Sequence, residues 1–191
     1  NSVMSDGKIG LILRSQRTNG YLERLSNRRK DNSLFHLNEL VTATSRLAIY
    51  WLPNMPEVLI NGPDGRLEGR YKHNEDDHAP IALMLHPHPQ YGGTMNNKAI
   101  YAMYHAFAGR GFSVLRFNFR GVGRSQGIYD RGEGELADAA SALDWLQGHN
   151  IGARQCWIAG FSFGAWIGMQ LLMRRPEITS FVSVAPPANL Y

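Results

Sequence analysis

The sequence holds a single cysteine, Cys156, among its 191 residues. One thiol cannot close an internal disulfide, which excludes a disulfide-stabilised secreted scaffold and favours a reducing cytoplasm. Long apolar runs are also missing. The run Leu47–Leu52 is far shorter than the roughly 20 residues that cross a bilayer, and it lacks the layout of a signal peptide. We therefore expect a cytoplasmic protein that does not bind a membrane.

Net charge is missing from most of the chain. Lysine and arginine outnumber aspartate and glutamate by 20 to 16, and the whole excess lies in residues 1–54, which hold eight basic and four acidic side chains. Residues 55–191 hold twelve of each sign. The positive charge is therefore no sign that the folded body binds nucleic acid.

Residues 1–54 also differ in pattern from the rest. They are rich in arginine as far as Asp31, a helical spacing of apolar residues begins near Ser33, and strands do not alternate with helices. A basic arm for an anionic partner is one interpretation. We favour the other, a basic N-terminal extension outside the conserved fold, or sequence translated upstream of a start at Met55.

From residue 55 onward, apolar runs alternate with helical patterns. Strands are expected at Glu57–Ile60, Arg66–Tyr71, Ile81–Leu85, Ser113–Asn118, Gln155–Ala159 and Thr179–Ala185, and helices at Asn97–Arg110, Glu135–Gln147 and Phe163–Arg175. The apolar face of the second helix is expected to be Leu136, Ala139, Ala140, Leu143 and Leu146. This alternation predicts an α/β fold with a mostly parallel sheet, helices on both faces and an antiparallel pair of strands at the front.

A short motif lies between the last predicted helix and the strand before it. Gly160-Phe161-Ser162-Phe163-Gly164 matches G-x-S-x-G, which is meaningful only between a strand and a helix. A turn this sharp would expose the hydroxyl of Ser162 as a nucleophile, and side chains at Gly160 and Gly164 would collide. The helix that follows directs its N–H groups at any oxyanion formed there. The alternative is that Ser162 only caps the helix.

The loop after the strand Ile81–Leu85 supplies a second candidate group. It reads His86-Pro87-His88-Pro89, and because proline has no N–H, His88 is the expected oxyanion donor beside Phe163. We expect His86 to orient this loop through a hydrogen bond. Two histidines at this spacing can chelate a metal, but no cysteine or clustered carboxylate accompanies them, so neither a metal nor a cofactor is expected.

Three motifs together resemble the α/β-hydrolase superfamily. His86–Pro89 resembles its H-G-x-P loop, in which x supplies the oxyanion N–H and the x–Pro bond is often cis. The run Arg120-Gly121-Val122-Gly123-Arg124-Ser125 resembles its R-G-x-G-x-S loop, and the serine motif resembles its nucleophile elbow. The resemblance implies the α/β-hydrolase fold and a cis His88–Pro89 bond.

Within the superfamily, the chain is similar to bacterial dienelactone-hydrolase-like and serine-aminopeptidase-like hydrolases that are uncharacterised. The similarity is carried by the loop His86–Pro89 together with the run Gly92–Asn97 that follows it. Two positions depart from the pattern. Pro87 replaces the usual glycine, and Ser162 stands where dienelactone hydrolases proper carry cysteine.

A general base is the most telling absence. In this fold the acid and the histidine follow the serine along the chain, but no histidine follows Ser162 and the only acid is Glu177. Glu177 is expected at the wrong end of the sheet. We therefore interpret the chain as a fragment whose catalytic acid and histidine lie beyond Tyr191, and which is inactive as it stands.

The function expected of the complete protein is that of a serine hydrolase. It would cleave esters, thioesters or amides of a small-molecule substrate through an acyl-enzyme. A hydrolase-fold module that only binds a ligand or partner is the alternative. Nucleic-acid binding through residues 1–54 has no fold signature behind it, so no nucleic-acid partner is expected.

Overall fold

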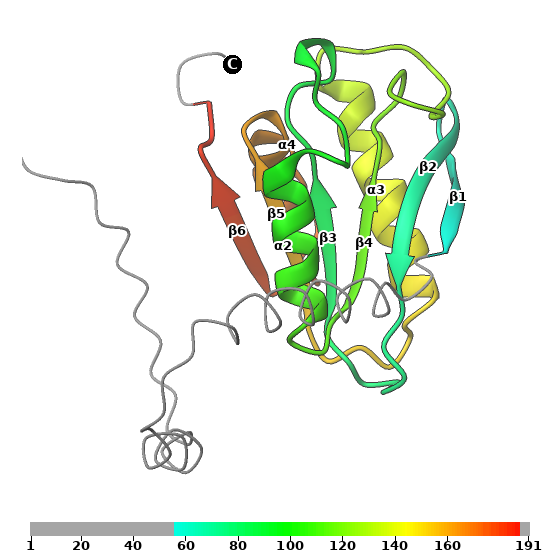
Figure 1. Ribbon diagram of the computed structural model, residues 1–191, viewed down its shortest axis with the longest axis vertical. Helices are drawn as coiled ribbons and strands as arrows, with labels where there is room; N and C mark the ends of the chain where they lie inside the picture. The colour runs from blue at the N-terminus through cyan, green and yellow to red at the C-terminus, as the bar shows by residue number, and fades with distance from the viewer. Residues whose placement is uncertain (1–55, 188–191) are drawn as a thin grey trace, which may run out of the picture. The chain divides into compact units, whose positions relative to one another are not determined.

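The computed structural model describes residues 56–187, which form one mixed sheet with helices packed on it (Figure 1). In chain order the elements are β1 (Glu57–Gly62), β2 (Gly65–Lys72), β3 (Ile81–Leu85), the 3₁₀ helix η1 (Pro89–Tyr91), α2 (Lys98–Ala108), β4 (Ser113–Phe117), α3 (Glu133–Gly148), β5 (Cys156–Phe161), α4 (Phe163–Leu172) and β6 (Ser180–Val184). The expected extension 1–54 lies outside the described residues.

The sheet has six strands in the order β1-β2-β4-β3-β5-β6. β1 pairs with β2 and β2 with β4 in antiparallel fashion, whereas β4, β3, β5 and β6 run parallel to one another. The predicted α/β architecture, mostly parallel with an antiparallel pair at the front, is therefore confirmed.

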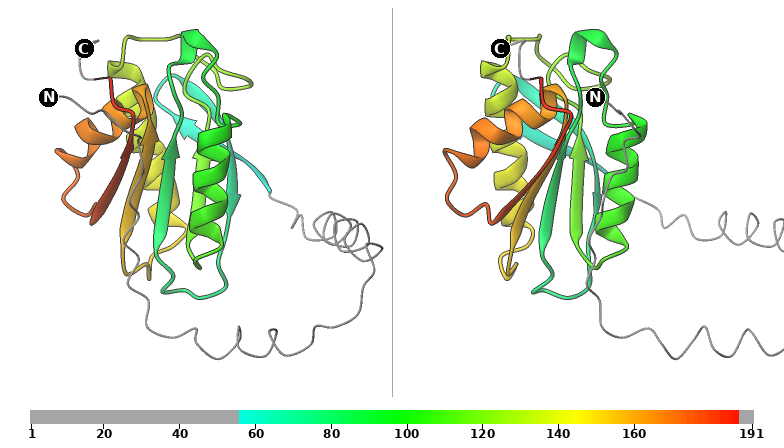
Figure 2. Two further views of the ribbon diagram at one scale, coloured as in Figure 1. Left: turned by 60° about the vertical axis from the view of Figure 1, so that its left-hand side comes forward. Right: turned by 90° about the vertical axis from the view of Figure 1, so that its left-hand side faces the viewer.

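Helices cover both faces of the sheet. In Figure 2, α2 lies on one face and α3 and α4 lie on the other. Side chains of β3 alternate between the two layers: Ile81, Leu83 and Leu85 join the core under α3 and α4, and Ala82 and Met84 join the core under α2. All five residues are buried, as a continuous apolar run in a parallel strand predicts.

The buried face of α3 differs from the predicted one. Leu136 and Ala140 are only partly buried against the core, while the buried positions include the carboxylates of Glu135 and Asp138 as well as Ala142. The apolar periodicity missed this rotation because the two acids are buried by hydrogen bonding rather than by hydrophobicity.

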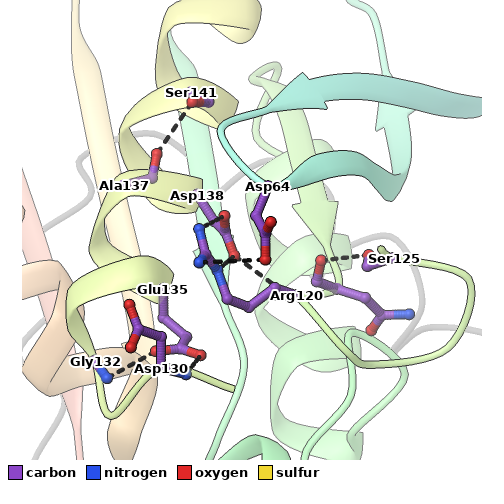
Figure 3. A network of polar contacts seen from close by, with 10 residues as sticks. Asp64, Arg120, Ser125, Asp130, Gly132, Glu135, Ala137, Asp138 and Ser141 are labelled. Carbon is purple, nitrogen blue, oxygen red and sulfur yellow. Dashed lines mark hydrogen bonds and ion pairs between the residues drawn. The ribbon is translucent and has the colours of Figure 1, made fainter. Parts of the chain in front are cut away.

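One of these acids holds a buried ion pair with the loop after β4 (Figure 3). Asp138 accepts hydrogen bonds from Nε and Nη2 of Arg120 at 3.0 and 2.8 Å, and from the backbone N–H of Arg120 at 3.0 Å. Arg120 is 7% exposed and Asp138 is fully buried. The hydrogen bond to Asp138 raises the pKa of Arg120. Asp64, from the β1–β2 turn, lies 3.8 Å from Nη1 of Arg120.

The second buried acid, Glu135, binds the other end of the loop that begins at Arg120. Glu135 accepts hydrogen bonds from the backbone N–H groups of Asp130 and Gly132 at 2.9 and 2.7 Å (Figure 3). Both ends of the loop 120–132 are therefore tied to carboxylates on the first turns of α3.

The lone cysteine lies at the start of β5. Cys156 is 6% exposed, and burial raises the pKa of its thiol to about 11. Within residues 56–187, none of the helices has the length and apolar character needed to cross a membrane.

The Arg120–Asp138 pair generates a stability prediction. Replacing Asp138 with alanine removes the hydrogen-bonded partner of a buried guanidinium, which should lower the free energy of unfolding by about 3–5 kcal/mol. The matched control is Asp144→Ala. Asp144 also pairs with an arginine, Arg175, but its side chain is 62% exposed, so the loss should be about 0–1 kcal/mol. Urea titration of both variants measures the difference, and equal losses would contradict the importance of the buried pair.

Candidate active site

The topology has a switch point at the carboxyl ends of β3 and β5. β3 and β5 are neighbours, with Leu85 paired to Gly160. The chain leaving β3 continues to α2, and the chain leaving β5 enters α4, on the opposite face (Figure 2). In open α/β sheets, ligands bind where adjacent strands send their connections to opposite faces. His86, His88 and Ser162 all follow these two strand ends.

Ser162 occupies a strained position between β5 and α4. Its backbone has φ 54° and ψ −117°, a region that non-glycine residues seldom adopt. Its N–H donates to the carbonyl of Val184 at 2.9 Å, which fixes the turn against the end of β6. The residue stands at the N-cap position of α4, yet its side chain makes no capping hydrogen bond. The geometry therefore gives no support to the interpretation of Ser162 as a mere helix cap.

The two glycines of the motif are required by close backbone contacts. A Cβ on Gly160 would lie 2.6 Å from the nitrogen of Ala165, and a Cβ on Gly164 would lie 2.6 Å from the carbonyl oxygen of His86. Cβ atoms do not approach backbone atoms so closely. The collisions expected from the sequence are therefore present: a side chain at residue 160 would meet the start of α4, and a side chain at residue 164 would meet the loop after β3.

His86 is fully buried and joins the ends of β3 and β4. Its Nε2 accepts a hydrogen bond from the N–H of Phe119 at 3.0 Å, and its Nδ1 lies 2.6 Å from the carbonyl oxygen of Pro87. These two contacts require a neutral ring with the proton on Nδ1. Burial lowers the pKa of His86 to about 4, although the hydrogen bond to Pro87 opposes the shift.

His88 lies at the base of η1 and contacts a residue that the sequence analysis did not identify. Its Nδ1 accepts from the N–H of Gln90 at 3.2 Å, and its Nε2 lies 3.1 Å from the hydroxyl of Tyr129. The ring centroids of His88 and Tyr129 are 5.0 Å apart. Burial lowers the pKa of His88, and the charge of Glu135 opposes this shift. Tyr129 could not be found from motif spacing, because it lies 41 residues away in a loop without periodicity.

The predicted cis bond between His88 and Pro89 is wrong. Residues 56–187 contain no cis peptide bond. His88 has φ −51° and ψ 124°, the extended conformation favoured before proline, and the trans bond directs the chain into η1 with Pro89 in its first turn. The carbonyl of His88 then accepts from the N–H groups of Tyr91 and Gly93 at 3.1 and 3.0 Å.

The structure brings the side-chain rings of His88 and Phe163 together. Their ring centroids lie 5.0 Å apart, and Phe163 is the first residue of α4, directly after Ser162. Glu177, by contrast, precedes β6 and lies at the amino end of the strands, where Nε of Arg175 donates to it at 2.6 Å. It is therefore remote from Ser162.

Metal binding finds no support in the side-chain geometry. Among the described residues, no group of three or more histidine, cysteine, aspartate and glutamate side chains could hold a metal ion. Nε2 of His86 already accepts a backbone hydrogen bond, so its lone pair is engaged.

The neutral state of His86 generates a prediction of how stability depends on pH. The unfolded ring has a pKa near 6.5 and the folded ring a pKa of about 4. As pH falls between these values, the unfolded chain takes up a proton that the folded chain does not, so stability decreases. The loss between pH 7 and pH 4 should approach about 3 kcal/mol.

Urea titrations at several pH values test this prediction. A His86→Gln variant keeps an acceptor and cannot titrate, so the difference between its pH dependence and that of the parent isolates His86. The same change at the exposed His78 is the matched control. Parallel curves for the parent and His86→Gln would mean that the folded imidazole accepts a proton freely.

Comparison with known proteins identifies the family. Residues 71–191 match the family described as X-Pro dipeptidyl-peptidase (S15 family). Over 135 residues the chain is 58% identical to an uncharacterized protein of Rickettsia prowazekii (strain Madrid E), covering 71% of this chain and 57% of that protein. The chain thus spans little more than half the length of this curated relative.

Solved structures agree with the family match. A putative α/β hydrolase of unknown function from Agrobacterium tumefaciens has 63% identity and a TM-score of 0.70, over 71% of this chain and 62% of that one. An α/β serine hydrolase homologue from Coxiella burnetii has 38% identity and a TM-score of 0.67, over 73% of this chain and 67% of that one. The chain belongs to the α/β-hydrolase superfamily and, within it, to the X-Pro dipeptidyl-peptidase (S15) family.

Proposed function

We propose that the complete protein is a serine hydrolase that cleaves an ester, thioester or amide of a small molecule, with Ser162 as its nucleophile. One observation carries the proposal: Ser162 has a strained backbone at a strand-to-helix turn, and its side chain does not cap the helix. Strain of this kind persists only where the surroundings enforce it, and it clusters at active sites. The dienelactone-hydrolase-like grouping and a cytoplasmic location belong to the same proposal.

The reaction follows from the nucleophile. Oγ of Ser162 attacks the substrate carbonyl carbon while a general base takes its proton. The tetrahedral intermediate then expels the alcohol, thiol or amine, which receives that proton, and an acyl-enzyme remains. Water attacks the acyl-enzyme in the same manner, releasing the carboxylic acid and restoring the serine hydroxyl.

Two backbone N–H groups are proposed to stabilise the oxyanion. The Phe163 N–H is the first of α4 and shares the positive end of its dipole. The His88 N–H lies on the neighbouring loop, and the contact between the two rings supports their convergence. In this assignment His86 is a positioning residue for the loop, Gly160 permits the tight turn at Ser162, and Gly164 permits the close approach of the two backbones.

The general base is proposed to come from sequence beyond Tyr191. His86 has both ring nitrogens in hydrogen bonds and a pKa lowered to about 4. The ring nitrogens of His88 contact the Gln90 N–H and the Tyr129 hydroxyl. Glu177 lies at the opposite end of the sheet. An acid and a histidine that follow Ser162 in the family order would complete the triad.

Covalent labelling tests the nucleophile. In the complete protein, a fluorophosphonate probe should modify Ser162, and Ser162→Ala should abolish labelling because the hydroxyl is lost. Peptide mapping locates the label. The control is Ser141→Ala, a serine on α3 whose hydroxyl donates to the carbonyl of Ala137; it should label like the parent. Undiminished labelling of Ser162→Ala would overturn the assignment and favour a module that only binds.

Ester hydrolysis tests the proposal that the general base comes from sequence beyond Tyr191. The 191-residue chain should turn over a p-nitrophenyl ester about 10⁶-fold more slowly than a protein extended to the length of its relatives, because loss of triad members removes a factor of this order. Comparable turnover by the two proteins, abolished in the shorter one by His88→Ala, would make His88 the base and refute the proposed location.

A further inference from the structure

A cleft opens beside the proposed active site, between the loop after β3 and the loop after β4. It encloses about 330 Å³. Pro89 and Gln90 form one wall, Val122, Ile128 and Tyr129 form the other, and Arg120 lines it as well. We call this space the loop cleft. None of the proposed catalytic roles uses it.

The loop cleft offers no unpaired cation to a charged ligand. Its charged lining residue is Arg120, which is 7% exposed and makes two side-chain hydrogen bonds with Asp138. Asp64 lies 3.8 Å from the same guanidinium, with its side chain 53% exposed. A second anion from a ligand would compete with two carboxylates already in place. The electrostatics therefore disfavour a ligand with a carboxylate or phosphate at this point.

The walls and the rim are largely apolar. Ile128 is 78% exposed, and Tyr91, next to the wall residue Gln90, is 86% exposed. Single exposed apolar residues are ordinary, but here they lie beside a concave lining that is mostly apolar, which is the usual composition of small-molecule sites. A cavity of about 150 Å³ accommodates benzene, so the loop cleft has room for an aromatic ring with a short linker.

Tyr129 connects the loop cleft to the proposed oxyanion loop. Its ring lines the cleft, its hydroxyl lies 3.1 Å from Nε2 of His88, and its ring centroid is 6.2 Å from that of Phe163. The wall residue Pro89 directly follows His88. The cleft therefore begins where the proposed oxyanion loop ends, at the same edge of the sheet as Ser162.

We infer that the loop cleft binds an uncharged apolar arm of the substrate, an aryl or short alkyl group, while the reacting carbonyl lies at Ser162. The inference rests on the proposed function and adds its substrate class. Esters and amides with a neutral hydrophobic arm are the preferred substrates, and those with an anionic arm are excluded.

Ester series with the complete protein test the substrate class. One series varies the acyl group of p-nitrophenyl esters: acetate, 3-phenylpropanoate and hemisuccinate. A second series keeps the acetyl group and varies the alcohol between ethanol and 2-phenylethanol. The phenyl-bearing ester should exceed its short counterpart in kcat/KM by about 10-fold in one of the two series, and the hemisuccinate should be the poorest acyl donor.

An acidic and a basic substitution at Ile128 distinguish a loss of binding in the cleft from damage to the fold, because damage to the fold would not depend on the sign of the charge. In the series that shows the preference, Ile128→Asp should lower kcat/KM for the phenyl-bearing ester about 10-fold, while the short ester of that series stays within about 2-fold. Ile128→Lys should also lower it, but should raise turnover of the hemisuccinate above that of the parent. The matched control is Ile151→Asp, because Ile151 is 93% exposed in the connection between α3 and β5, at the other end of the sheet; it should change neither value.

The outcomes separate this inference from the proposed function. Fluorophosphonate labelling of Ser162 is measured in every variant and does not depend on the apolar arm. If Ser162 labels normally but neither series shows a preference for the phenyl group, the substrate class is refuted and the nucleophile stands. Equal effects of Ile128→Asp and Ile128→Lys on all esters would likewise refute binding in the cleft. Failure of labelling in the parent would refute the proposed function itself.

Discussion

The site depends on the close contact between the first turn of α4 and the end of β3. Gly164 lies against the carbonyl groups of Leu85 and His86, with no space for a Cβ atom. This contact draws the start of the helix to the loop that carries His88, so the two proposed oxyanion donors belong to backbones that already touch. A side chain at residue 164 would push them apart, because a backbone carbonyl cannot yield as a flexible side chain can.

The surrounding loops are held by polar groups that are almost all buried and paired. His86 ties the loop after β3 to the amide of Phe119, and Oδ1 of Asn118 accepts from the N–H of Met95 at 2.8 Å. Arg120 and Glu135 then fasten the two ends of the loop after β4 to α3. Buried polar groups whose partners are satisfied rigidify a structure, whereas unsatisfied ones weaken it. The edge of the sheet that holds the candidate site is thus built from loops that are fixed at several points.

Sequence patterns predicted the fold well because apolar side chains dictate it. The continuous run Ile81–Leu85 and the strand–helix alternation follow directly from burial on both faces of a parallel sheet. The serine motif was equally readable as a pattern of fixed residues, although the steric demand is local in sequence at Gly160 alone; Gly164 lies against the carbonyls of Leu85 and His86. Burial of Asp138 was not predictable, because its partner Arg120 is 18 residues away and no periodicity links an acid to a guanidinium. The contact of Tyr129 with His88 escaped for the same reason. The trans His88–Pro89 bond departs from the family pattern, in a loop where Pro87 replaces the usual glycine.

The reactivity of the buried Cys156 thiol depends on local opening of β5. The thiolate is the form that reacts with alkylating reagents, and burial suppresses it by raising the pKa to about 11. Cys156 lies on β5, the strand that leads into Ser162, and the backbone N–H of Thr179 donates to its carbonyl at 2.8 Å. β5 lies between β3 and the edge strand β6, so reaction is favoured by local opening at the start of β5. The rate of alkylation in the native protein would measure how often the sheet opens at the strand that leads into Ser162, with no introduced probe.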